Sequence, residues 1–392
     1  MDIKELDKNH ILQNYARLPL ELVSGAGAIV TDKDGNDYID FTAGIGVTSL
    51  GHANKKITKA ICAQSKKLIH ASNLFYNECG ANLAKQLCDV TGYDKAFFCN
   101  SGTEAVEAVI KTMRKAGAER EGKPYKIVVL EGSFHGRTLG ALSATMQDVM
   151  QNGFFPLLDG FVKIPPDDTK KLESAMADPL VVGLLVELVM GEGGVRPLTK
   201  QFVKRAGELC KVHNKIFAVD EVQTGVGRTG RFLCAENYNV TPNLVSIAKG
   251  LGGGVPIGAV LFDKSLSSVL TAGTHGTTFG GNPLVTAVAG AVVSEIANPK
   301  FLARVRSKST RLRKQLQKIF GAKAVHGVGF MIGIDVGGVE KAKAIQAECI
   351  KQGLLVLLAK DRIRLLPPLN VNQKEIDAAC GILDGVSRGR GN

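Results

Sequence analysis

The sequence predicts an α/β protein with a mainly parallel sheet in a large domain and a smaller α+β domain at the C-terminal end. Between residues 56 and 285, strand-like apolar runs alternate with helical stretches, and connections of this length imply parallel strands joined by helical crossovers. After residue 285 two helical stretches precede two strand-like runs. Since 392 residues exceed a typical single core, we expect an N-terminal segment (1–55) that packs with the small domain, a large domain (56–285) and a small domain (286–392).

Local patterns predict the individual elements. Residues 27–41 contain two β-like runs around an Asp-Gly turn, which is typical of a hairpin. The clearest strands of the large domain are short apolar runs, namely Tyr125–Leu130, Val181–Glu187, Lys215–Val219, Leu244–Ala248 and Ala259–Phe262. An Ala/Val-rich helix then follows Pro283, and a basic helix covers 304–318. Val328–Val336 and Arg362–Leu366 are predicted as strands of the small domain.

Composition and charge exclude several classes of function. The net charge is +12, but the basic residues are spread along the chain and their densest run, 304–318, fits one solvated helix face, so we expect no nucleic-acid partner. No run approaches the ~20 apolar residues that span a bilayer. Met1–Asp7 carries acids and lacks an apolar leader, which predicts a cytoplasmic location. The eight cysteines form no CxxC pair and have no histidine at ligand spacing, so we expect reduced thiols and no metal site.

An amine and an acid at the ends of two strand-like runs are the most informative feature for function. Lys249 follows Leu244–Ala248 and precedes a glycine cluster, and Asp220 follows Lys215–Val219. Ligands of open α/β sheets bind beyond the carboxyl ends of the strands. Pyridoxal phosphate presents a carbonyl at one end and a pyridine at the other, which call for a Schiff-base lysine and a carboxylate at the ring nitrogen. The pair therefore predicts a pyridoxal-phosphate enzyme.

Other interpretations of Asp220 and Glu221 were a solvated acidic loop or a Mg²⁺ ligand in an NTPase. The chain contains no GxxxxGK[ST] motif, and no strand is followed by GxGxxG and a helix, so both the NTPase and the dinucleotide-binding interpretations fail. A carboxylate buried after an apolar strand is destabilising unless it is paired. A pyridinium N–H would be the partner that keeps Asp220 ionised.

Further segments after strand ends complete the predicted site. Ser101–Thr103 open a predicted helix, where backbone N–H groups and hydroxyls form a phosphate cradle, although alone they would be an ordinary helix N-cap. Phe134 can stack on one face of a planar ring and Val222 can pack on the other, while Arg137 can bind a carboxylate. The long loop over 275–283, rich in hydroxyls and glycines, is of a kind that is often functional.

These segments resemble the ordered motifs of the class III, fold-type I aminotransferases, which depend on pyridoxal 5'-phosphate. The matching segments are Asn100–Ala105, Phe134–Thr138, Gly191–Gly194, Asp220–Gly230, Ala248–Gly254 and Thr274–Pro283. The resemblance covers nearly the whole chain and implies a seven-stranded, mainly parallel sheet. Within the family, His70–Tyr76, Leu50–His52 and the short amino terminus are most similar to the branch that acts on N-acetylornithine in arginine biosynthesis.

The resemblance implies roles at the cofactor. Lys249 would form the Schiff base and, once displaced, would move the proton in the 1,3-shift, which requires a neutral amine. Asp220 would pair with the ring nitrogen, and Gln223 would bond the 3′-oxygen. Other contacts would come from Ser101, Gly102, Thr103, Phe134, His135, Val222 and, from the neighbouring subunit, Thr278. The resemblance thus implies a homodimer with shared active sites.

The resemblance also implies how two substrates share one site. Arg137 and Tyr15, with Asn14 alongside, would hold the α-carboxylate of the amine donor and leave its far amine at the cofactor. Arg364 would bind the α-carboxylate of glutamate or 2-oxoglutarate in the other half-reaction. Glu192 would neutralise Arg364 while the ornithine-type substrate is bound. The expected partners are therefore a small amino acid and 2-oxoglutarate.

Departures from the family pattern leave the amine donor open. Leu188 and Met190 stand where relatives usually have Pro and Gln, close to Glu192, and Val106 stands where Asn is common. Alternative donors are ornithine, succinylornithine, 4-aminobutyrate and succinyl-diaminopimelate. Ile45 favours an acylated donor, because an ornithine-specific relative would more often have Tyr there. A remote alternative is a non-catalytic cofactor-binding protein, which the intact lysine, acid and arginine disfavour.

Overall fold

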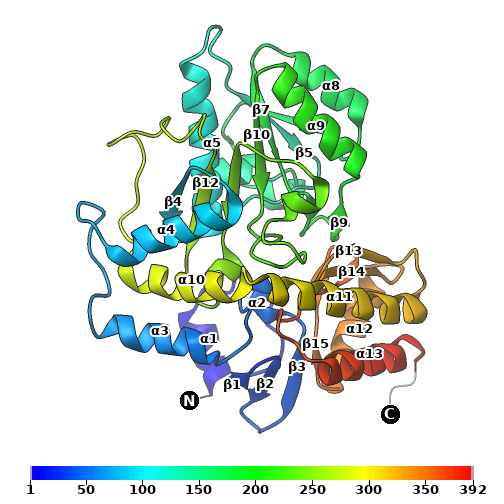
Figure 1. The fold of residues 1–392 in the computed structure, drawn as a ribbon. Coiled ribbons are helices and arrows are strands. Elements are labelled where there is room, and N and C mark those ends of the chain that lie inside the picture. Colours follow the sequence, from blue (N-terminus) through cyan, green and yellow to red (C-terminus); the bar gives the residue numbers. More distant parts are fainter. Residues whose placement is uncertain (1, 390–392) are drawn as a thin grey trace.

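A seven-stranded sheet forms the upper half of the protein in Figure 1. The computed structural model describes residues 2–389, so residues 1 and 390–392 of the predicted terminal segments lie outside it. The strands, in spatial order, are β4 (Lys95–Cys99), β12 (Gly258–Phe262), β11 (Leu244–Ile247), β10 (Ile216–Asp220), β7 (Val181–Val186), β5 (Lys126–Leu130) and β6 (Phe161–Ile164). All run in one direction except β12, which is antiparallel to both its neighbours. The predicted mainly parallel sheet is confirmed.

The prediction of a parallel strand was wrong for β12. Its residues pair antiparallel with β11, with Leu244 opposite Phe262. Residues 248–257 connect the two strands through a short 3₁₀ turn, η2 (Lys249–Leu251), and glycine turns. A parallel connection needs a crossover of about a dozen residues or more, usually with a helix. The connection from β11 is too short for one, so the chain reverses.

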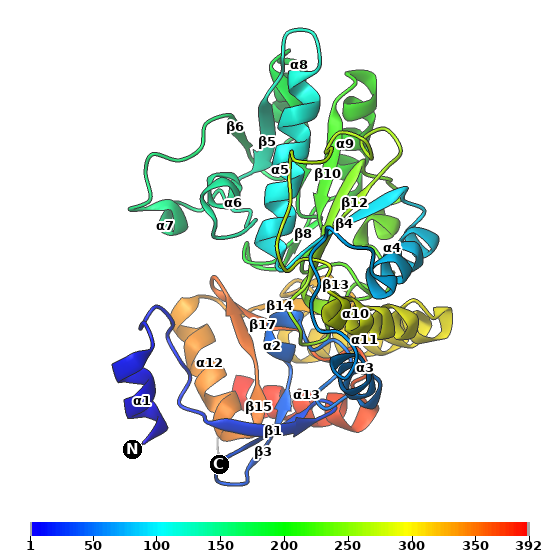
Figure 2. The same cartoon turned by 90° about the vertical axis from the view of Figure 1, so that its left-hand side faces the viewer.

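Helices cover both faces of this sheet, whose central strands are buried along their whole length. On one face α5 (Gly102–Ala118) packs against β11 and β12, and on the other α8 (Thr169–Ala177) and α9 (Lys200–Val212) pack near β7 (Figures 1 and 2). The shorter elements of this region are α6 (Leu139–Ala144), α7 (Asp148–Gln151), β8 (Val189–Met190), β9 (Arg196–Pro197) and η1 (Cys234–Tyr238). Within residues 2–389 no helix is both long and apolar enough to cross a membrane.

Two four-stranded sheets lie below the large sheet in Figures 1 and 2. One contains β1 (Leu22–Ala26), β2 (Ile29–Asp32), β3 (Asp37–Asp40) and, from the C-terminal part of the chain, β15 (Leu354–Leu355), which pairs parallel with β3. The other contains β13 (Val325–Val328), β14 (Met331–Asp335), β17 (Arg362–Leu365) and β16 (Leu357–Ala359). The hairpin predicted over 27–41 is confirmed as β2 and β3. The domain boundaries at residues 55 and 285 stay a prediction.

The remaining helices enclose the two smaller sheets and join them to the large one. Helices α10 (Pro283–Ile296) and α11 (Pro299–Phe320), in yellow, run across the junction between the upper and lower halves (Figure 1). Helix α10 packs against α3 (Lys55–Ser65) and α4 (Glu78–Thr91), and α11 packs against α13 (Gln373–Ser387). The others are α1 (Ile3–His10), α2 (Ala43–Gly46) and α12 (Val339–Lys351).

The sequence predicted that the basic residues of α11 form one solvated face. The structure contradicts this prediction, because three of them bind backbone carbonyls. Arg306 donates to the carbonyl of Gly230 at 2.6 Å, and Lys308 donates to the carbonyl of Val371 at 2.6 Å. Arg313 donates to the carbonyl of Gly327 at 2.5 Å. Long basic side chains can lie along an apolar surface and place their charged ends on backbone acceptors. Part of the positive charge therefore holds neighbouring segments together.

Candidate active site

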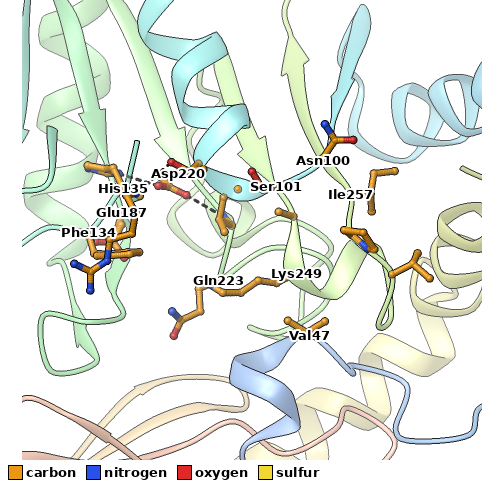
Figure 3. A pocket seen from close by; sticks show the side chains of 18 of the residues that line it. Val47, Asn100, Ser101, Phe134, His135, Glu187, Asp220, Gln223, Lys249 and Ile257 are labelled. Atoms are coloured by element: carbon orange, nitrogen blue, oxygen red, sulfur yellow. Dashed lines mark hydrogen bonds and ion pairs between the residues drawn. The ribbon is translucent and has the colours of Figure 1, made fainter. Parts of the chain in front are cut away.

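A cavity of about 410 Å³ opens at the carboxyl ends of the parallel strands. Loops that follow β4, β5, β10 and β11 line it, together with Val47 from the N-terminal part of the chain (Figure 3). Among the predicted site residues, those that line it are Ser101, Gly102, Thr103, Phe134, His135, Arg137, Asp220, Val222, Gln223 and Lys249. The common strand direction explains how segments distant in sequence meet at one edge.

Lys249 enters the cavity from a sharp turn at the end of β11. Its φ of +41° lies in the left-handed region, which a side chain other than glycine adopts only under constraint. Burial lowers the pKa of its amine, and this effect outweighs the opposing charges of Asp220 and Glu192. The amine can thus be neutral, as a nucleophile and a proton acceptor must be.

Asp220 ends β10 and faces the same cavity. Its Oδ2 lies 2.8 Å from Nδ1 of His135, and its Oδ1 accepts the N–H of Val222 at 3.0 Å. An ionised carboxylate can only accept hydrogen bonds, so Nδ1 of His135 carries the hydrogen when Asp220 is charged. The adjacent Glu221 faces away from the cavity, where it accepts the N–H groups of Cys234 and Ala235. The strand end therefore presents Asp220 alone to a ligand.

The start of α5 also lines the cavity, next to Val222. Ser101 is its N-cap, with Oγ accepting the N–H of Glu104 at 3.2 Å, so the capping and the cavity-lining interpretations both hold for this residue. Gly102 sits so close to Val222 that an added Cβ would lie 2.5 Å from Cγ1 of that side chain. The first N–H groups of a helix lack intrahelical acceptors and attract anions.

These groups fit pyridoxal phosphate. The helix start suits the phosphate, and Asp220 suits a protonated ring nitrogen. Lys249 suits the carbonyl, and Phe134 and Val222 supply apolar faces for the ring. Among residues 2–389 no group of three or more His, Cys, Asp or Glu side chains is arranged to hold a metal ion.

Two arginines near the cavity differ in burial and in their charge partners. Arg364, on β17, is 3 % exposed and forms an ion pair with Glu192, and its Nη1 lies 3.5 Å from Oε1 of Gln223. Arg137 is exposed, and its guanidinium lies 5.7 Å from the centroid of the Phe134 ring. No ion pair links Arg137 to any residue in the described part of the chain. The charge of Arg364 is thus paired with Glu192, whereas Arg137 is available to bind an anionic group of a substrate.

Besides Glu192 and Arg364, which lie beside the cavity, three predicted residues do not line it. Thr278 is exposed in the loop after β12, although its neighbour Thr277 accepts a hydrogen bond from Asn100 at 3.0 Å. Asn14 and Tyr15 lie in an exposed N-terminal segment, and Tyr15 is 71 % exposed. Their roles stay predictions.

The cavity residues without a role in the sequence interpretation include Glu187, Val47 and the segment Val255–Ile257. Glu187 follows β7 and is buried, and burial, together with the charge of Asp220, raises its pKa to about 7 although the nearby His135 lowers it. An acid directly after an apolar run was the signal used for Asp220, so the same signal could have found it. Val47 comes from a segment far away in sequence and had no such signal.

Comparison with known proteins identifies the class. The sequence model of the family described as aminotransferase class-III matches residues 11–386. This chain therefore belongs to the class-III aminotransferases, which are transaminases that use pyridoxal phosphate. The family, enzyme class and cofactor predicted from the motifs are confirmed.

The similar proteins include enzymes with two related names. Acetylornithine aminotransferase of Haemophilus ducreyi is 41% identical over 98% of this chain and 98% of its own length. The crystal structure of N-acetylornithine aminotransferase from Stenotrophomonas maltophilia has a TM-score of 0.84 at 34% identity, and the match covers 98% of each chain. Ornithine aminotransferase of Toxoplasma gondii, with partial occupancy of PLP at its active site, has a TM-score of 0.94 at 32% identity over 99% of this chain and 94% of its own.

Proposed function

We propose that this protein transfers the δ-amino group of N2-acetyl-L-ornithine to 2-oxoglutarate, giving N-acetylglutamate 5-semialdehyde and L-glutamate, a step of arginine biosynthesis. The observation that carries the proposal is the Arg364–Glu192 ion pair beside the cavity that holds Lys249 and Asp220. Such a pair can be closed for one substrate and open for the other. The similarity to acetylornithine aminotransferases supports the choice of the acylated donor.

The cofactor, when bound, supplies an aldehyde that captures the amine and a ring that withdraws electrons from the substrate. Lys249 would hold the aldehyde carbon of the cofactor covalently and, once displaced by the substrate amine, would carry the proton from the reacting substrate carbon to that aldehyde carbon. Asp220 keeps the ring nitrogen protonated, and His135 fixes its orientation through the 2.8 Å hydrogen bond. The N–H groups at the start of α5, around Gly102, hold the phosphate.

Charge separates the two half-reactions. Arg137, which has no carboxylate partner in the described residues, holds the α-carboxylate of acetylornithine, while Glu192 keeps Arg364 occupied. For 2-oxoglutarate, Glu192 must leave Arg364 so that the arginine can bind the α-carboxylate. Ile45 precedes the cavity residue Val47 by two positions and has no hydroxyl that could bind a free α-amine, which favours an acylated donor.

We further propose a cytoplasmic homodimer as the active form. Exposed apolar side chains gather in the segment before α4 and in the loop after β12, and they include Leu74 at 88 %, Phe75 at 70 %, Tyr76 at 108 % and Phe279 at 61 %. A second copy covering this surface would bring Thr278 to the partner's phosphate. Sedimentation at micromolar concentration should therefore give twice the chain mass of 41.6 kDa. A monomer with full activity would contradict the shared site.

A panel of amine donors tests the proposed substrate. The purified, cofactor-loaded protein is given 2-oxoglutarate with acetylornithine, ornithine, succinylornithine, 4-aminobutyrate or succinyl-diaminopimelate, and glutamate formation is measured. We expect the highest kcat/KM with acetylornithine. A higher value with another donor would assign that donor instead. No glutamate with any donor, in protein that binds the cofactor, would support the non-catalytic alternative.

Substitution of Arg364 by Ala should damage one half-reaction more than the other. The 2-oxoglutarate half-reaction loses its carboxylate anchor, a charge-assisted contact for which about 2–3 kcal/mol is typical, or roughly 30- to 150-fold in kcat/KM. The acetylornithine half-reaction loses only the partner of Glu192. Single-turnover spectroscopy of each half-reaction measures the two effects separately. Equal losses would contradict the gate assigned to Glu192.

A further inference from the structure

Glu187 accepts hydrogen bonds from two separate loops with its two carboxylate oxygens. Oε2 accepts the N–H of Phe134 at 2.9 Å, and Oε1 accepts the N–H of Gly191 at 3.0 Å. Phe134 belongs to the loop that covers the cofactor ring. Gly191 begins the turn that carries Glu192, so a single buried side chain joins the two loops. Figure 3 shows Glu187 beside Phe134 and His135 at one side of the cavity.

The turn that begins at Gly191 also contacts Gln223 and strand β17. An added Cβ on Gly191 would lie 2.6 Å from Nε2 of Gln223, so the backbone rests directly on that side chain. Arg362 donates to the carbonyl of Gly194 at 2.8 Å, and Glu192 pairs with Arg364 on the same strand β17. A displacement of Gly191 would therefore also displace Gln223 and Arg364, the arginine proposed to bind 2-oxoglutarate.

We propose that Glu187 is a positioning residue, which links the loop that covers the cofactor ring to the loop that gates Arg364 and so keeps the two in register during turnover. The proposal rests on the roles proposed above for Phe134 and Glu192. Glu187 itself touches backbone N–H groups and transfers no proton.

The charge state of Glu187 determines whether the link exists. An ionised carboxylate accepts both N–H groups strongly, whereas in a protonated one the oxygen that carries the hydrogen is a much weaker acceptor for its N–H group. Burial and Asp220 raise its pKa to about 7, while His135 and the two N–H groups lower it. Lys249 also faces it across the cavity. We therefore expect the link to be nearly complete at pH 8, to be formed in about half of the molecules near pH 7 and to weaken further as the pH falls toward 6.

Stability alone does not explain an ionised Glu187. Its pKa is raised on folding, so its contribution to the free energy of unfolding is full below the ordinary value of 4.5 and is lost as the pH rises through about 7. The ionised form is therefore the less stable one for the fold, although it is the form that makes both hydrogen bonds. The positioning role rests on the two hydrogen bonds, which reach the backbones of two separate loops at Phe134 and Gly191.

Glu221 is a matched control for this chemistry. It is also buried, accepts two backbone N–H groups (from Cys234 and Ala235) and has its pKa raised to about 8, mainly by burial. It faces away from the cavity, however, and anchors η1. Substitution of either acid by Gln keeps the volume and places an amide NH₂ against one of the two donors.

Hydrogen–deuterium exchange of the full chain, with and without pyridoxal phosphate, tests the link without depending on turnover. In Glu187→Gln the side chain can accept only one of the two N–H groups, so the peptide of the other loop, 131–138 or 189–195, should exchange faster, on the order of tenfold, as expected for a lost hydrogen bond. In Glu221→Gln both peptides should exchange at the wild-type rate. Wild-type exchange in both peptides of Glu187→Gln, or equal changes in both variants, would overturn the proposal.

Two further measurements keep the outcome decisive. If Glu187→Gln does not fold, the wild-type protein is measured from pH 8 to pH 6, where one of the two peptides should lose protection after correction for intrinsic rates. Unchanged protection would overturn the link. In the folded variants, the ratio of kcat/KM for the two half-reactions should shift on the order of fivefold in Glu187→Gln and stay at the wild-type value in Glu221→Gln. The donor panel fails separately if the proposed substrate is wrong, because exchange is measured without substrate.

Discussion

Replacement of Lys249 by Ala should abolish turnover while leaving some cofactor bound. In the proposed function the lysine is both the covalent anchor and the group that moves the proton, and positioned acid–base groups alone contribute roughly 10²–10⁴-fold. The helix start at Gly102 and the carboxylate of Asp220 remain, so pyridoxal phosphate can still bind without a covalent link. Steady-state assays give the loss in kcat, and absorbance after gel filtration gives the bound cofactor.

Lys215 provides the control for this substitution. Burial also lowers the pKa of its amine, but it lies at the start of β10, at the opposite end of the strand from Asp220, where it donates to the carbonyls of Asp178 and Val181. Lys215→Ala should lower the melting temperature and leave the turnover of the folded enzyme within a factor of about three. Borohydride should fix the cofactor on Lys249 in the wild type and in this control. Substantial turnover by Lys249→Ala, or a mass label on another lysine, would contradict the assignment.

Replacement of Asp220 by Asn should reduce turnover by the second largest amount. The side chain keeps its shape and can still accept the N–H of Val222, but it no longer carries the charge that stabilises a protonated ring nitrogen. Removal of one partner of a buried charge pair typically costs about 3–5 kcal/mol, or on the order of 10²–10³-fold in rate. The rate of substrate deprotonation in single-turnover experiments measures this effect directly.

The neighbouring acid again supplies the comparison. Glu221→Gln changes a carboxylate one residue away that faces the other side of β10 and contacts η1. This variant should lose stability but retain rapid deprotonation of the substrate. If Asp220→Asn deprotonates the substrate at the wild-type rate, the carboxylate does not support the ring nitrogen. If both variants lose the rate equally, the effect comes from the strand end as a whole.

Much of the fold could be predicted because its signals are local. The apolar runs that became β5, β7, β10 and β11 are continuous over their length, as strands buried on both faces must be. Their common direction follows from the helical connections between them. Strand β12 is the exception. It was predicted to be parallel like the other strands, although the segment that connects it to β11 contains no α-helix, and it is antiparallel.

The sequence predicts those residues of the candidate site that directly follow a strand. Asp220 and Lys249 follow apolar runs directly, so their presence at one edge of the sheet follows from the sequence. Glu187 carries the same signal, but nothing local indicates that it holds two loops at once. The pairing of Arg364 with Glu192 was implied by family resemblance, and spacing alone could not have given it, because 172 residues separate the two.

The sequence by itself determined the class of chemistry, because an amine and an acid at the ends of buried parallel strands must share one edge of the sheet. Only the tertiary structure decided which groups control one another there. It joined β3 to β15 across most of the chain and turned Glu221 away from the cavity. It also placed the Glu187 carboxylate between the backbone N–H groups of Phe134 and Gly191, which belong to separate loops. Such contacts depend on how distant segments pack and on which buried groups find partners, and no local period encodes either.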